Sequence, residues 1–134
     1  MLAKLRSHSK CNNVMDTIEK GCDLIMKEHG TGHTEAFYEK ALSHYLYELC
    51  IPFLTQVDCF VQKSSAQIHV GRIDMEVSHS TILEFKVGTN VRPQDLTQLQ
   101  KYIRARQACG IEIKCAAVIC FRTDGKVEVC KFTF

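Results

Sequence analysis

The sequence predicts an α/β domain with a central mixed sheet flanked by helices. Three observations predict it: two N-terminal segments with helical spacing, three consecutive stretches rich in β-branched and aromatic residues, and a further helical segment followed by two more strands. The order is helix, helix, three strands, helix, two strands, without repeat or linker. The 134 residues correspond to one domain. A chain of this length buries roughly two-thirds of its unfolded surface, so it needs neither disulfides nor a structural metal to fold.

Two helices are expected in the first fifty residues. From Asn12 to about His29 apolar residues recur every three or four positions, which is the spacing of one buried helical stripe. Gly30-Thr31-Gly32 ends this helix. The second helix should run from about Thr34 to Leu49 and end before Ile51-Pro52, because the residue before a proline is pushed out of the helical region.

Extended segments follow. Short polar turns separate three stretches with strand composition, which favours an antiparallel meander of Phe53–Val61, Gln67–Val77 and Thr81–Val87. Helical spacing returns after Pro93, a residue suited to the first turn of a helix, and continues to Gly110.

Two further strands complete the chain. Ile111–Phe121 is apolar on both faces in its second half, which indicates an interior strand. Asp124-Gly125 predicts a hairpin leading into Lys126–Phe134.

The charge of the chain gives little indication of its partner. The net charge is only +2, so a surface for nucleic acid must come from local clustering. Lys101, Arg104 and Arg106, with Arg92 upstream, are the candidates for contacts to phosphates, and a solvated helix face is the alternative. No apolar run approaches the ~20 residues that span a bilayer, so no membrane partner is expected.

The eight cysteines are expected to be reduced. They form no CxxC pair, most lie in apolar periodic segments, and the first ten residues lack the apolar stretch of a secretory signal. The expected location is therefore intracellular, cytoplasmic or nuclear, with a transit peptide as the alternative. Residues 1–11 are expected to form a basic N-terminal tail, and residues 12–134 a single domain.

The residues that point to chemistry lie on two neighbouring strands. Strand side chains alternate, so Glu84 and Lys86 share one face of their strand, and Asp74 is expected to share a face with Arg72 and Glu76. If the strands pair around the short turn, Asp74 and Glu84 converge. Two carboxylates with a lysine two residues on suit a hard cation and a positioned water. The alternative is a solvated strand face, which routinely carries such residues.

A second motif makes the pattern more specific. The run from Gly32 to Tyr38 (GHTEAFY) resembles the signature of the GxxExxY family, whose small proteins are assigned to the PD-(D/E)XK nuclease superfamily. Within this resemblance, Asp74 matches the metal-binding aspartate and Glu84-Phe85-Lys86 matches the E-x-K element. The run from Gln98 to Tyr102 (QLQKY) resembles the Q-x-x-x-Y of RecB-like members. The resemblance covers about Asn12 to Phe121 and implies a restriction-endonuclease-like αβββαβ core.

The resemblance also implies an activity: Mg²⁺- or Mn²⁺-dependent hydrolysis of DNA. Asp74, Glu84 and the backbone carbonyl of Phe85 would bind the metal, and Lys86 would position the attacking water. Glu35 would be a further ligand or would hold an outer-shell water or a second ion.

Each of these residues also has a structural interpretation. Glu35 also complements the helix dipole, and Tyr38 is expected to be a core aromatic with a hydrogen-bonded hydroxyl. Gln98 and Tyr102 would orient the site or the strand, with an exposed glutamine and a core aromatic as the alternatives. A homodimer is compatible with this picture. The rival function is a non-catalytic nucleic-acid-binding or interaction module that retains the fold.

Overall fold

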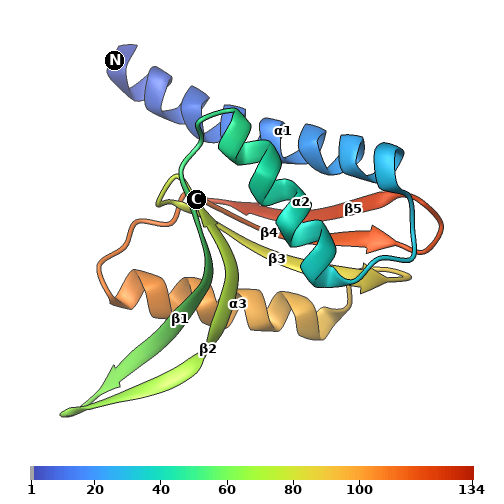
Figure 1. Cartoon of the computed structure of the whole chain (residues 1–134). Coiled ribbons are helices and arrows are strands. Elements are labelled where there is room, and N and C mark those ends of the chain that lie inside the picture. The colour runs from blue at the N-terminus through green and yellow to red at the C-terminus, as the bar shows by residue number, and fades with distance from the viewer. Residues whose placement is uncertain (1) are drawn as a thin grey trace.

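The structure is a computed structural model that describes the backbone of residues 2–134 and the side chains of residues 14–134. Its elements are α1 (Leu2–His29), α2 (Glu35–Glu48), β1 (Phe53–Lys63), β2 (Ala66–Val77), β3 (Thr81–Gly88), α3 (Pro93–Ala108), β4 (Cys115–Arg122) and β5 (Val127–Thr133). The α/β fold and the αβββαβ order are therefore confirmed. Figure 1 shows α1 and α2 on one side of the sheet and α3 on the other.

The sheet is mixed, with strand order β1-β2-β3-β4-β5. Neighbouring strands are antiparallel except β3 and β4, which run parallel and are connected through α3. A parallel pair needs such a crossover, because a short turn reverses the chain. In Figure 1 the long β1–β2 hairpin curves away from the other strands and passes beside α3.

Two apolar cores cover the two faces of the sheet. The first lies between the sheet and helices α1 and α2 and contains Ile18, Leu42, Leu46 and Phe85. The second lies between the sheet and α3 and contains Ile73, Ile82, Leu99 and Val118. β4 is buried along nearly its whole length, as the apolar composition of an interior strand predicts.

Two element boundaries differ from the prediction by more than two residues. α1 begins at Leu2 rather than near Asn12, and Ile111–Lys114 precede β4 without being part of it. The side chains of the predicted basic tail, residues 1–11, lie outside the described residues. Among residues 2–134, no helix is long and apolar enough to cross a membrane.

The segment from Gly30 to Tyr38 shows why the second helix starts where it does. Thr34 is the N-cap, and its hydroxyl accepts a hydrogen bond from the N–H of Phe37. Tyr38 is buried, donates its hydroxyl to the carbonyl of Gly30 at 2.7 Å and stacks on Phe121. The expected core role of Tyr38 is confirmed. The result is that Glu35 occupies the first position of α2.

Candidate active site

Asp74 and Glu84 lie where β2 and β3 separate. The backbone pairing of these strands covers Met75↔Leu83 to Val77↔Thr81 and stops one residue before Asp74 and Glu84. Beyond this point carboxylate oxygens, in place of backbone carbonyls, accept hydrogen bonds from the strand N–H groups. The N–H of Asp74 donates to Oε1 of Glu84 at 3.0 Å, and the N–H of Phe85 donates to Oδ2 of Asp74 at 2.8 Å. The two carboxylates predicted from sequence are therefore brought together and fixed by the backbone.

Side-chain alternation in β2 breaks at Asp74. Ile73 belongs to the core under α3, whereas Met75 belongs to the core under α1 and α2, although residues two apart in a regular strand share a face. The expectation that Asp74 shares one face with Arg72 and Glu76 is therefore wrong. Glu76 is buried and forms an ion pair with Arg106 of α3, with Nε and Oε2 2.7 Å apart.

Glu84 is an unusual carboxyl group. Only 6% of the residue is exposed. Burial, and next the negative charge of Asp74, raise its pKa from 4.5 to about 8, against the opposing effects of the Asp74 N–H and of Lys86. The side chains of Glu84 and Asp74 lie close to one another. Without a cation, this pair favours a protonated Glu84 near neutral pH.

The donor set fits a hard divalent cation. Asp74 and Glu84 each use one oxygen to accept a backbone N–H, which leaves Oδ1 and Oε2 for a ligand. In an extended strand the N–H and C=O of one residue point to the same side. The carbonyl of Phe85 therefore opens toward Asp74, into the gap between the strands. Two carboxylates and a carbonyl are oxygen donors of the kind that Mg²⁺ binds. Among the described residues, no three His, Cys, Asp or Glu side chains form a metal cluster.

Glu35 reaches the same strand farther along. Its Oε2 accepts the N–H of Val87 at 3.2 Å. Asp74 and Glu35 thus satisfy successive unpaired donors on the edge of β3, two residues apart, which is roughly 7 Å along a strand. Glu35 lies beside the carboxylate pair without joining it.

Lys86 follows Glu84 on the same face of β3. It is half-buried, and its ammonium lies close enough to Glu84 to lower the pKa of that carboxyl. The predicted neighbourhood of Asp74, Glu84 and Lys86 is therefore present at one point of the sheet.

Tyr102 approaches this point from α3. Its hydroxyl lies close to the side chain of Gln98 and to the backbone of Arg72. Burial raises the pKa of Tyr102, and the charges of Glu84 and Asp74 add to this effect. Gly71 makes the approach possible, because a Cβ at this position would lie 2.6 Å from the Tyr102 hydroxyl oxygen. Gln98 and Tyr102 thus lie beside the carboxylates.

The basic residues of α3 are divided among different surroundings. Lys101 and Arg104 are exposed. Arg104 lines a hollow with Phe132 and Phe134, about 160° around the helix from Tyr102. The structure does not bring Arg104 to the carboxylates. Arg106 is occupied by Glu76, and Arg92 is the N-cap of α3.

Three residues near the site were given no role in the sequence analysis: Gln56, Glu39 and Gly71. Gln56 of β1 lies opposite Asp74, and its Nε2 donates to both carboxylate oxygens of Glu39 at 3.0 and 3.1 Å. Gly71 contacts Tyr102 as described. An isolated glycine within a strand pattern is a signal for close backbone approach. No sequence signal marks the pairing of Gln56 with Glu39, which are 17 positions apart.

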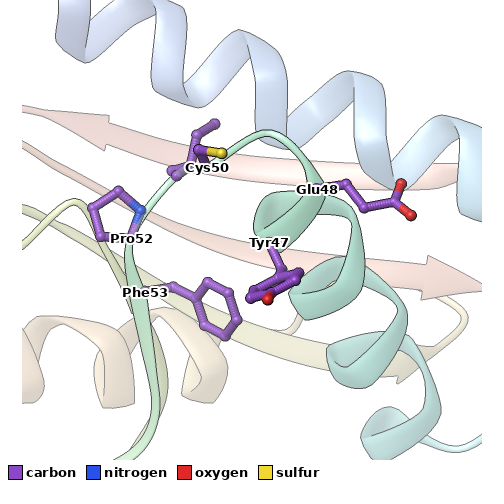
Figure 2. Close-up of a pocket in the computed structure, with 6 residues that line it drawn as sticks. Tyr47, Glu48, Cys50, Pro52 and Phe53 are labelled. Atoms are coloured by element: carbon purple, nitrogen blue, oxygen red, sulfur yellow. The ribbon is translucent and has the colours of Figure 1, made fainter.

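Two hollows lie beside α2. The first, of about 610 Å³, is lined by Ala36, Phe37, Glu39, Lys40, Ser43, Thr55, Gln56 and Arg72. The second, of about 660 Å³, lies at the corner between α2 and β1. Figure 2 shows the rings of Tyr47 and Phe53 facing one another there, with Cys50 and Pro52 on the connecting segment. No predicted site residue lines this second hollow.

The chain is similar to one family of known proteins over most of its length. The family model described as the PD-(D/E)XK nuclease superfamily matches residues 12–132. A search of curated proteins finds no match. A solved structure titled "Crystal structure of SSO0001" is similar at 14% sequence identity with a TM-score of 0.45. The similarity covers 90% of this chain and 66% of that one.

Proposed function

Because the chain belongs to the PD-(D/E)XK nuclease superfamily, we propose that it is a metal-dependent nuclease that hydrolyses DNA phosphodiester bonds. One observation carries this proposal: two carboxylates converge where β2 and β3 separate, with Lys86 beside them. Closing the backbone alone has no need of two negative charges, because an amide would accept the same N–H groups and a buried carboxylate is costly unless it is paired or binds a cation.

The proposed ligands are Asp74, Glu84 and the carbonyl of Phe85. When bound, Mg²⁺ or Mn²⁺ would polarise the phosphate and lower the pKa of the attacking water. The chain's own residues hold this centre before the substrate arrives, since the backbone N–H groups of Asp74 and Phe85 fix one oxygen of each carboxylate. Such preorganisation avoids rearrangement during the reaction.

Lys86 is proposed to position the water and to offset negative charge on the phosphate oxygens. Its charge contributes most in the transition state, where that negative charge accumulates. Glu35 is proposed to hold an outer-shell water or a second ion from its place beside Val87.

The finer assignment is that the chain is a GxxExxY protein with a RecB-like Q-x-x-x-Y element. In support, the side chains of Gln98 and Tyr102 lie close together, and Tyr102 lies near both carboxylates. We propose that this pair orients β2 through the backbone of Arg72. Lys101 is proposed to contact phosphates next to the site, and Arg104 to contact them farther along α3. Residues 12–134 are proposed to form one domain, since both cores share one sheet.

The test is cleavage by the purified chain. Linear, circular and single-stranded DNA, with an RNA of the same sequence, are incubated with Mg²⁺, Mn²⁺ or EDTA. We expect cleavage of DNA that EDTA abolishes, and the Glu84→Gln variant, which lacks one ligand charge, is the matched inactive control. Binding of DNA without cleavage under any metal would favour the non-catalytic module instead.

A further inference from the structure

Gln56 interrupts the sheet opposite Asp74. The β1–β2 register includes Thr55↔Met75 and Val57↔Ile73, but Gln56 and Asp74 between them are not paired. Gln56 has a φ of 53°, in the left-handed region that residues with a side chain rarely adopt. The backbone of Asp74 is therefore paired neither with β1 on one side nor with β3 on the other.

The side chain of Gln56 ties this kink to α2. Its amide donates to both oxygens of Glu39, which lies one turn after Glu35 on the same helix. Glu39 is half-buried and lies near Asp74, whose charge helps to raise the pKa of Glu39 after the larger effect of burial. One bridge thus joins the kinked strand, the helix of Glu35 and the surroundings of Asp74.

We propose that Gln56 is a positioning residue for the cation site, acting through its left-handed backbone and its bridge to Glu39. The kink turns Asp74 out of the regular ladder, so that its carboxylate faces the N–H of Phe85. The bridge to Glu39 then holds the kink at a fixed distance from α2. Residues kept in sparsely populated backbone conformations cluster at functional sites, where the surrounding contacts hold them. This inference rests on the proposed function, because it concerns the same cation site.

The experiment compares Mn²⁺ affinity, by titration calorimetry on the full chain, with the free energy of unfolding in EDTA. Gln56→Gly adopts the left-handed backbone without strain but cannot reach Glu39. We expect its unfolding free energy to stay equal or rise, while Mn²⁺ affinity falls by about tenfold or more, the range for residues that orient metal ligands. If Gln56 served stability alone, Gln56→Gly would not lower the Mn²⁺ affinity while leaving the free energy of unfolding unchanged.

Two further variants test the route through Glu39. Glu39→Gln keeps an acceptor for the Gln56 amide and should retain most of the affinity, whereas Glu39→Ala should lose as much as Gln56→Gly. The double variant Gln56→Gly with Glu39→Ala should lose no more than either alone, because both remove one bridge. Glu39→Ala leaves β1 unchanged, so it carries the same test if Gln56→Gly fails to fold.

Ser64 is the matched control. It lies in the β1–β2 turn with a φ of 55°, so Ser64→Gly relieves a similar strain away from the site. We expect Ser64→Gly to leave Mn²⁺ affinity unchanged. If the wild type binds Mn²⁺ and Gln56→Gly binds it equally well, the inference is overturned and the proposed function stands. If Glu39→Gln loses as much as Glu39→Ala, Glu39 acts by its charge and the positioning route is overturned. A wild type that binds no divalent cation would overturn the proposed function and the inference together.

Discussion

Asp74 and Glu84 each accept a hydrogen bond from the strand that carries the other. The N–H of Asp74 donates to Glu84 at 3.0 Å, and the N–H of Phe85, next to Glu84, donates to Asp74 at 2.8 Å. The same carboxylates thus accept the backbone N–H groups that are left unpaired where the strands separate. Their remaining oxygens are available to a cation. The predictions below separate these two roles.

The Asp74→Asn substitution should remove divalent-cation binding without unfolding the chain. Asparagine keeps an acceptor for the N–H of Phe85 but lacks the negative charge. We expect Mn²⁺ affinity to fall by at least about a hundredfold, because one charge at contact distance corresponds to several kcal/mol at an effective dielectric constant of ~20. Calorimetry measures the affinity, and thermal melting checks the fold. Asp58→Asn, an exposed aspartate of β1, is the control and should bind normally. An Asp74→Asn variant with wild-type affinity would exclude the site.

Glu84 should make the metal-free chain less stable as the pH rises. Its folded pKa of about 8 lies above the ordinary value of 4.5. The extra stability of the protonated form is therefore fully present below about pH 4.5 and is lost as the pH rises through about 8. The loss is on the order of a few kcal/mol. Denaturant unfolding in EDTA at pH 6 and pH 9 measures it.

The matched comparison for this effect is Glu84→Gln. Glutamine does not titrate, so the fall in unfolding free energy between the two pH values should be smaller in the variant than in the wild type. Saturating Mn²⁺ should reduce the wild-type difference as well, since a cation favours the charged carboxylate. Equal pH dependence in wild type and variant would contradict the raised pKa.

The Lys86→Met substitution should separate a catalyst from a binding module. Methionine keeps the unbranched chain and removes the ammonium. We expect cleavage to fall by on the order of a hundredfold or more, about 2.7 kcal/mol of barrier. DNA affinity and melting temperature should change little, since an exposed or half-exposed charge contributes only ~0–1 kcal/mol to stability. Lys40→Met, in the hollow beside Arg72, is the control for lost charge. If Lys86→Met weakens DNA binding and the wild type never cleaves, the binding module is the better interpretation.

All eight cysteines should be found in the reduced form. None of the seven whose side chains are described is in a disulfide, and Cys22, Cys59, Cys115 and Cys120 are buried; the side chain of Cys11 lies outside the described residues. Burial raises the pKa of Cys59 and of Cys120 and so disfavours the reactive thiolate. Thiol counting in denaturant without reductant, on freshly purified protein, is the measurement. A count that falls short by two or more pairs of thiols would contradict the expected intracellular location.

The sequence was informative wherever the signal was local. Strand periodicity placed Asp74 and Glu84 on adjacent strands, and the short turn between them set a register that brought them opposite one another. Helical spacing put Gln98 and Tyr102 on one side of α3. The break at Gly30-Thr31-Gly32 predicted a second helix from about Thr34, and α2 begins at Glu35.

What the sequence could not provide depends on contacts between distant segments. The period of two assigns Asp74, Arg72 and Glu76 to one face, and this rule breaks at Asp74, where the pairs with Gln56 and with Glu84 are both missing. The hydrogen bonds between Gln56 and Glu39 join a strand to a helix, and no spacing encodes them. Arg104 and Lys101 were both candidates for contacts to phosphates because both are basic. Arg104 instead lines a hollow with Phe132.

The double use of the carboxylates has a consequence for how this fold would change over generations. A lineage that lost catalysis would still need acceptors for the N–H groups of Asp74 and Phe85, so an acidic or amide side chain would persist at positions 74 and 84 under selection for folding alone. Lys86 closes no backbone bond of this kind, and it would drift once cleavage no longer mattered. Among descendants of this chain, the residue at position 86 is therefore a better record of retained activity than the two carboxylates.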